Sequence, residues 1–207
     1  MAKTAKKPGS SDRATVKLSE VAKLLRLPPG VRDQKVKKGG KNLKLVSITD
    51  LPEAGFIEKV VGSITLSVDK FNSIKKYTLQ PFDLLMSIQG TVGVVGVVTE
   101  KFSGTWMANI SLLVVRFAEN KKENSVALLE YLKSSFGKGI IKKLQKGSTI
   151  KRVNVKEFAA VKIPGLSTEV KKESAALFAK EIGVKKKIDD LYSSMADLRA
   201  SYLKGAK

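Results

Sequence analysis

Amide and ammonium side chains are interleaved over a short segment of the sequence, at Lys70, Asn72, Lys75 and Lys76. Side chains of these types hydrogen bond to base edges in the major groove of DNA. The surrounding residues, 68–79, have the pattern of a basic connection or a short helix. The sequence therefore predicts a base-reading element in this segment.

A second basic segment spans residues 26–44 and contains two prolines, three glycines and a single acidic residue, Asp33. Proline and glycine at this density are typical of a flexible loop, whose backbone can follow a groove. We expect its cations to contact DNA phosphates, and a purely solubilising role is the alternative. These cations are Arg26, Arg32, Lys35, Lys37, Lys38, Lys41 and Lys44.

A third basic group flanks the stretch 143-KLQKGSTIKRVNVKEFAAVKIPGL-166. It is expected to form a second contact with the DNA backbone, because phosphate contacts position a protein on the duplex. The group consists of Lys138, Lys142, Lys143, Lys146, Lys151 and Arg152.

The glycine-rich stretch QGTVGVVGVV (89–98) has the spacing Gly-x-x-Gly-x-x-Gly. This spacing matches neither the dinucleotide fingerprint nor the phosphate-binding P-loop. Two interpretations remain open. The glycines allow apolar strands to bend or to approach another backbone closely, or the loop reaches a DNA phosphate through the polar residues around Gly90, including Gln89 and Thr91.

The composition excludes several kinds of catalysis, because the chain contains neither cysteine nor histidine. Thiolate chemistry, histidine acid–base chemistry and zinc sites built on the usual ligands are therefore excluded. Asp50 and Asp83 are isolated between apolar residues, which favours turn caps over acids. Trp106 is expected in the core. We expect a binding protein that is not an enzyme and holds no metal or cofactor.

The charge balance indicates a polyanionic partner. The chain of 207 residues has 39 Lys and Arg against 19 Asp and Glu, a net charge of +20. Nucleic acid and anionic membranes are the usual partners of such proteins. No run approaches the roughly 18 apolar residues of a membrane span, and residues 1–14 lack the apolar core of a signal peptide. We therefore expect a disordered basic leader over residues 1–14 and a cytoplasmic protein without a membrane partner.

Residues 15–166 have the pattern of one α+β domain. A short helix is expected within residues 16–25, capped near Ser19. Helical spacing over residues 125–147 predicts a helix that stops at Phe136–Gly137 and restarts near Ile140. Strands are expected within residues 43–51, 56–67, 81–88, 92–99, 107–117 and 151–166.

From residue 167 the sequence changes character. Apolar residues recur at alternating spacings of three and four up to Tyr202, interrupted only by Glu181. This is a heptad seam, the pattern that pairs one helix with another. Residues 167–207 are therefore expected to form a long spacer and dimerisation helix. Its seam consists of Leu177, Val184, Ile188, Leu191, Met195, Leu198 and Tyr202.

Several segments, taken in order, resemble a single family. They are VKLSEVAKL, LKLVSITDL, YTLQPFDLLMSIQGTVG, WMANISLLVVRF and GSTIKRVNVKEFAAVKIPGL followed by the long helix. The chain is similar, from about Thr15 to Leu203, to the specificity subunits of type I restriction–modification enzymes. Members of that family usually carry two recognition domains and two helices, and this sequence shows one set without an internal repeat. It therefore resembles a half subunit.

The resemblance implies a function and a set of partners. Residues 15–166 would be a target recognition domain for double-stranded DNA. Two copies would form a homodimer through an antiparallel coiled coil, and would prefer a gapped palindrome. A partner methyltransferase, with S-adenosylmethionine bound to it and not to this chain, would methylate adenine. A restriction subunit would join through the methyltransferase.

Three other classes fit parts of the same pattern. A non-specific nucleic-acid-binding protein, ribosomal or RNA-associated, would also be basic, but it needs no heptad seam and would bind all sequences alike. A recognition subunit of another restriction class would share the fold and differ in its partner. A structural coiled-coil adaptor would dimerise without binding DNA.

Overall fold

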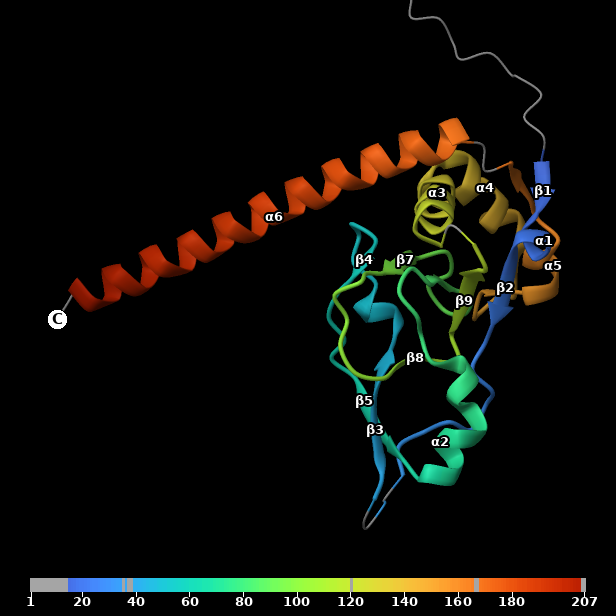
Figure 1. The fold of residues 1–207 in the computed structure, drawn as a ribbon, viewed down its shortest axis with the longest axis horizontal. Coiled ribbons are helices and arrows are strands. Elements are labelled where there is room, and N and C mark those ends of the chain that lie inside the picture. The colour runs from blue at the N-terminus through green and yellow to red at the C-terminus, as the bar shows by residue number, and fades with distance from the viewer. Residues whose placement is uncertain (1–14, 35, 37–38, 120, 166–167, 206–207) are drawn as a thin grey trace, which may run out of the picture.

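The computed structural model places one mixed α/β domain before a long C-terminal helix (Figure 1). The residues that it describes are 15–34, 36, 39–119, 121–165 and 168–205. The predicted basic leader, residues 1–14, lies outside the described residues. The strands are β1 (Thr15–Lys17), β2 (Ala22–Leu25), β3 (Lys41–Val46), β4 (Phe56–Ile57), β5 (Ser63–Leu66), β6 (Leu84–Ser87), β7 (Val95–Val98), β8 (Trp106–Ala108), β9 (Leu112–Phe117), β10 (Gln145–Lys146), β11 (Arg152–Val153) and β12 (Lys162–Pro164).

Helices border the sheets at several points of the chain. They are α1 (Leu18–Val21), α2 (Val68–Ile74), α3 (Lys121–Lys133), α4 (Ser135–Leu144), α5 (Val155–Ala159) and α6 (Thr168–Gly205), with the 3-10 helices η1 (Ile48–Asp50) and η2 (Lys75–Tyr77). In Figure 1, α6 starts beside α3 and α4 and extends away from the domain, whereas α2 and β3 lie toward the other end.

The larger sheet has the strand order β2-β9-β6-β7-β4 and is antiparallel except for the β4–β7 pair. The apolar runs that predict strands at residues 81–88, 92–99 and 107–117 contain β6, β7 and β9, so these predictions are confirmed. Side chains of β9 alternate between two cores: Leu113 and Val115 face the core under α3, and Leu112 and Val114 face a second core. A strand buried on both faces needs a nearly continuous apolar sequence.

The smaller sheet has the order β5-β3-β8, with β3 antiparallel to β5 and parallel to β8. Leu43, Leu66 and Met107 from its three strands pack with Ile74 of α2 in a third core. Because strand side chains alternate, the adjacent residues point to the other face. Trp106, which is expected in the core, is only 4% exposed.

The helix predicted within residues 16–25 is wrong in extent. The segment forms β1, the single turn α1 and β2. Val16 pairs with Ile163 of β12, and Ala22 pairs with Phe117 of β9. Strand pairing at both ends outweighs the local helical pattern, since intrinsic propensity is only a weak preference.

The break in the helical segment 125–147 also differs from the prediction. Helix α3 ends before Ser134, whose Oγ accepts a hydrogen bond from the backbone N–H of Gly137 at 3.2 Å and caps α4. Gly137 therefore lies in the first turn of α4 and does not end a helix. A Cβ at this position would lie 2.1 Å from the carbonyl oxygen of Tyr131, so the glycine is required by close packing of the two helices.

The segment 151–166 is a strand, a helix and a second strand, where the sequence predicts one strand. Asn154 interrupts it, because its Oδ1 accepts from the backbone N–H of Lys156 at 2.8 Å and caps α5. Phe158 of α5 is buried in the main core. Asparagine caps helices well, and this local interaction decides the structure.

The C-terminal helix is confirmed, with 38 residues in α6. Its first turns are attached to the domain through Phe178, which is 5% exposed and lies edge-on to Phe56 with ring centroids 4.6 Å apart. Lys133 of α3 forms an ion pair with Glu181 at 3.7 Å. Burial, and next the charge of Glu181, raise the pKa of Glu130 beside this pair above its ordinary value.

The apolar seam of α6 faces solvent in this structure. Leu177, Val184, Ile188, Leu191, Met195 and Leu198 are 44% to 70% exposed. The side chain of Tyr202 lies outside the described ones. Among the described helices, none has the length and apolar character that a membrane crossing requires.

Phe178→Ala is expected to lower the free energy of unfolding by about 3 kcal/mol, because it removes a buried ring from the contact between α6 and the domain. Phe136→Ala is the matched control. Phe136 is 67% exposed, so its truncation should change the value by about 0.5 kcal/mol or less. Urea denaturation followed by circular dichroism measures both, and equal losses would contradict the anchoring role of Phe178.

Candidate nucleic-acid interface

Helix α2 presents its polar residues to solvent. Ser67 caps it by accepting a hydrogen bond from the N–H of Lys70. Asn72, Lys75 and Lys76 are exposed, whereas Lys70 is half-buried. Of the two predictions for residues 68–79, a basic connection or a short helix, the structure has the helix, as α2 followed by η2. A base-reading role for its side chains stays a prediction.

The basic segment 26–44 is attached to the edge of the small sheet. Asp33 Oδ1 accepts from the backbone N–H of Thr65 at 2.6 Å, and the N–H of Gln34 donates to the Thr65 carbonyl at 2.9 Å. These contacts satisfy the edge of β5 and hold part of a loop that the sequence predicts to be flexible. Arg32 and Lys41 are exposed beside this attachment.

The other two described cations of this segment, Arg26 and Lys44, lie at different places in the fold. Arg26 Nε donates to the carbonyl of Ile110 at 2.9 Å, which places this cation at the end of β2. Lys44 is an exposed residue of β3. Three predicted phosphate contacts, Lys35, Lys37 and Lys38, lie outside the described residues.

The glycine-rich loop and the third basic group come together at the β10–β11 hairpin. Gln89 forms an antiparallel bridge with Arg152, and the N–H of Gly90 donates to the carbonyl of Lys151 at 3.1 Å. The sequence treats these segments separately and gives no signal of their contact. Thr91, Lys151 and Arg152 are exposed at this junction.

Backbone conformation and close packing explain the glycines of this stretch. Gly90 and Gly93 have φ of +79° and +89°, a left-handed backbone that glycine adopts without strain. A Cβ on Gly93 would lie 3.0 Å from Ile141 of α4, and one on Gly96 would lie 3.0 Å from Ile57. The bending and close-approach interpretation is therefore confirmed, and phosphate contact by Gln89 and Thr91 stays a prediction.

Two further cations of the third group, Lys142 and Lys143, lie in the last turn of α4 and are exposed. Lys146 of β10 differs, because its Nζ donates to Glu157 of α5 in an ion pair. Exposed ion pairs of this kind are weak, but the carboxylate partly neutralises the charge that Lys146 would offer to a phosphate. Lys138 is also exposed.

Asp83 is a buried structural group, as the turn-cap prediction requires. Its Oδ2 accepts from the N–H of Gln80 at 2.8 Å, and Arg116 donates to both carboxylate oxygens at 2.8 and 2.6 Å. Arg116 also donates to the carbonyl of Thr78 at 2.7 Å. Sequence reasoning missed this ion pair, although a lone arginine inside the apolar strand β9 was the signal.

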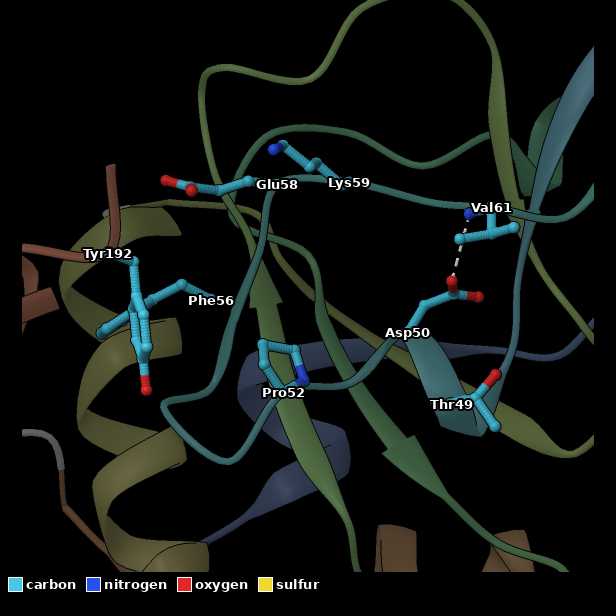
Figure 2. Close-up of a pocket in the computed structure, with 8 residues that line it drawn as sticks. All are labelled: Thr49, Asp50, Pro52, Phe56, Glu58, Lys59, Val61 and Tyr192. Carbon is cyan, nitrogen blue, oxygen red and sulfur yellow. Dashed lines mark hydrogen bonds between the residues drawn. The ribbon is translucent and has the colours of Figure 1, made fainter. Parts of the chain in front are cut away.

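A cleft of about 610 Å³ lies between segment 49–61 and Tyr192 of α6 (Figure 2). Phe56 forms part of its apolar wall, and Asp50 Oδ1 accepts from the N–H of Val61 at 3.2 Å. Asp50 also caps η1, as predicted. No group of three or more potential metal ligands gathers in the part of the chain that the structure describes. The cleft offers a contact surface, which the sequence does not predict.

Residues 10–179 match the family described as the type I restriction modification DNA specificity domain. The chain belongs to this family. The resemblance to the specificity subunits is thereby confirmed, with one recognition domain in this chain. No curated protein sequence gives a significant match.

Several solved structures share the fold of this specificity-family chain. One is the S subunit of a type I restriction–modification system from M. genitalium, with 14% identity, a TM-score of 0.52, and coverage of 91% of this chain and 43% of that one. Another is the HsdS subunit from Thermoanaerobacter tengcongensis, with 16% identity, a TM-score of 0.55 and coverage of 91% and 41%. The chain spans less than half the length of these two structures.

A likeness of fold extends to another restriction class. The type IIG restriction endonuclease BpuSI has 10% identity and a TM-score of 0.56, with coverage of 80% of this chain and 26% of that chain. At these identities the structures show the fold alone.

Substitution of Lys151 and Arg152 by alanine is expected to weaken DNA binding and its salt dependence. Each lost phosphate contact lowers the magnitude of the slope of log K against log salt concentration by about 0.9. Lys186→Ala, on exposed α6, serves as the control and should leave the slope unchanged. Fluorescence anisotropy on duplex DNA at several salt concentrations measures this. An unchanged slope in the double variant would remove the β10–β11 hairpin from the DNA path.

Proposed function

We propose that this chain is the sequence-specific DNA-recognition subunit of a type I restriction–modification complex. The observation that carries the proposal is the match of residues 10–179 to the DNA specificity family. The large net charge of +20 supports double-stranded DNA as the partner. Affinity comes from cations on phosphates and specificity from side chains that reach base edges.

Two separate cationic surfaces are the proposed phosphate contacts. One surrounds the attached segment 26–41, with Arg26, Arg32 and Lys41 in its described part. The other is the β10–β11 junction, where the loop carrying Gln89 and Thr91 meets the basic hairpin. Its cations are Lys142, Lys143, Lys146, Lys151 and Arg152.

The domain organisation follows the same proposal. Residues 15–166 form the target recognition domain, and residues 167–207 form the spacer and dimerisation helix. The 38 residues of α6 span about 57 Å at 1.5 Å per residue. Two copies pair through the exposed seam as an antiparallel coiled coil, because an isolated apolar seam of this length gains stability only from a partner helix. A two-fold dimer then recognises a bipartite, palindromic site.

The chemistry belongs to the partners in this proposal. A methyltransferase subunit binds S-adenosylmethionine and methylates adenine, and a restriction subunit joins through it. Another solved structure with the same fold, at 18% identity and a TM-score of 0.54, concerns the complex assembly and conformational transition of the type I R-M system. This chain, in the cytoplasm with its DNA, supplies recognition and holds the half-sites apart without a catalytic group of its own.

A second candidate function has one specific observation in its favour. The fold likeness to the type IIG endonuclease BpuSI supports a recognition unit that serves another restriction class. The DNA-reading role is the same in both cases, and only the identity of the catalytic partner differs. Copurification with a separate type I methyltransferase subunit supports the first function, and its absence supports the second.

Selection from random duplex DNA, with the chain alone and with a type I methyltransferase subunit that copurifies with it, is expected to enrich a gapped palindrome. A single ungapped half-site would support the recognition domain and contradict the dimer. Failure to enrich any sequence, with affinity falling steeply in salt, would show general nucleic-acid binding and contradict the proposed function.

Leu191→Lys is expected to convert the dimer to a monomer, because it places a charge in the apolar seam. Ser193→Lys adds the same charge on α6 outside the seam and should leave the mass unchanged. Light scattering coupled to size exclusion gives the mass of each variant. A wild-type monomer, or a dimer that persists in Leu191→Lys, would contradict pairing through the seam.

A further inference from the structure

The face of the small sheet opposite α2 is only partly covered: Val46, Trp106 and Ala108 are buried there in the second core, and the remaining part, where β3 pairs with β5, is called here the open face. Leu43, Leu66 and Met107 face α2 on the opposite side. Strand alternation therefore turns the intervening residues, Asn42 and Thr65 among them, to the open face. This open face is hollowed, with a volume of about 440 Å³, and Leu43 and Ile64 line the hollow beside its polar side chains. Its lining includes Asn42, Lys44, Ser63, Thr65, Ser103 and Thr105.

One pair of side chains in this hollow has a defined orientation. Asn42 and Thr65 are direct cross-strand partners on β3 and β5. Thr65 Oγ1 donates to Asn42 Oδ1 at 2.8 Å. The contact fixes which end of the amide faces the sheet and leaves Nδ2 as a hydrogen-bond donor, and within the described part of the chain Nδ2 meets no acceptor. A donor fixed on a strand loses little freedom when it binds a ligand.

The far wall of the hollow is held rigidly as well. Trp106 is buried, its Nε1 donates to the carbonyl of Ser103 at 2.9 Å, and its ring packs on Phe102 with centroids 5.0 Å apart. The backbone N–H of Lys44 donates to the carbonyl of Thr105 at 2.8 Å. Segment 103–105 is therefore a fixed edge of the hollow.

One cation, Lys44, lines the hollow, and others lie on the neighbouring segments of the chain. Arg32, Lys41 and Lys44 are exposed, and none of them forms an ion pair with a described residue. The nearby carboxylate of Asp33 is turned toward the backbone of Thr65. A row of strand-borne hydrogen-bonding groups with cations at its rim suits a duplex, because a two-stranded β-ribbon fits the major groove.

We propose that the open face of the small sheet reads base edges, with Asn42 donating from Nδ2 to a purine acceptor and Thr65 positioning its amide. The inference rests on the proposed function and names the surface that gives it sequence specificity. Since α2 covers the opposite face, a duplex seated on this hollow leaves Asn72 of α2 away from the bases. The sheet and α2 are therefore competing candidates.

The test is selection from random duplex DNA with the full chain and its methyltransferase, comparing the wild type with Asn42→Ala, Asn42→Asp, Thr65→Val and Asn72→Ala. Asn42→Ala and Asn42→Asp are expected to lose the preference at one or two base positions and to weaken binding to the wild-type site roughly tenfold. The salt slope of Asn42→Ala should stay unchanged, because no phosphate contact is removed and no charge is added. Thr65→Val should relax the same positions less strongly, and Asn72→Ala should keep the wild-type preference.

Urea denaturation of each variant separates lost recognition from lost folding, and Asn42→Asp keeps the shape of the side chain while removing the donor. Both Asn42 variants keeping the wild-type preference would overturn the inference, as would relaxation by Asn72→Ala alone. A wild-type chain without any preference would instead contradict the proposed function, so the two failures are distinguishable.

Discussion

Strand β9 is the constraint on which the rest of the molecule depends. It pairs with β2 on one side and β6 on the other, and its alternate residues supply the two larger cores. A strand placed this way tolerates charge only when the charge is paired. Arg116 meets this condition through Asp83, and its extra bond to Thr78 fixes the chain that follows η2. The main core, the small sheet and the attachment of α2 therefore share one buried element.

The local sequence pattern predicted the elements in which the same burial pattern continues from one end of the element to the other. The apolar runs of β6, β7 and β9 and the long helix α6 are of this kind. The pattern failed where distant or very local contacts decide. Val16 is extended because Ile163 pairs with it, and the stretch that ends the domain is divided because Asn154 caps a helix. Glycine ends many helices, so the sequence predicts a helix end at Gly137. In the structure this glycine instead allows α4 to pack closely against α3.

The sequence predicts which residue types form the candidate interface, but it predicts only part of their positions in the fold. Density of lysine and arginine is visible in a sequence, and so is the absence of histidine and cysteine. Contacts between distant residues are not visible in the sequence. The sequence therefore does not predict the bridge between Gln89 and Arg152 or the pairing of Asn42 with Thr65. The sequence also does not show that the charge of Lys146 is partly neutralised, since its partner is a glutamate on a different element.

The pairing of β1 with β12 also bears on how the protein is made. The first described strand has its hydrogen-bonding partner immediately before α6, so β1 has no partner until the ribosome has released the chain past Pro164. Contacts between the two ends of a domain are the slow ones to form, and domains fold as units during synthesis. The sheet that joins the two ends of the domain is therefore completed late in synthesis, after β12 has been made.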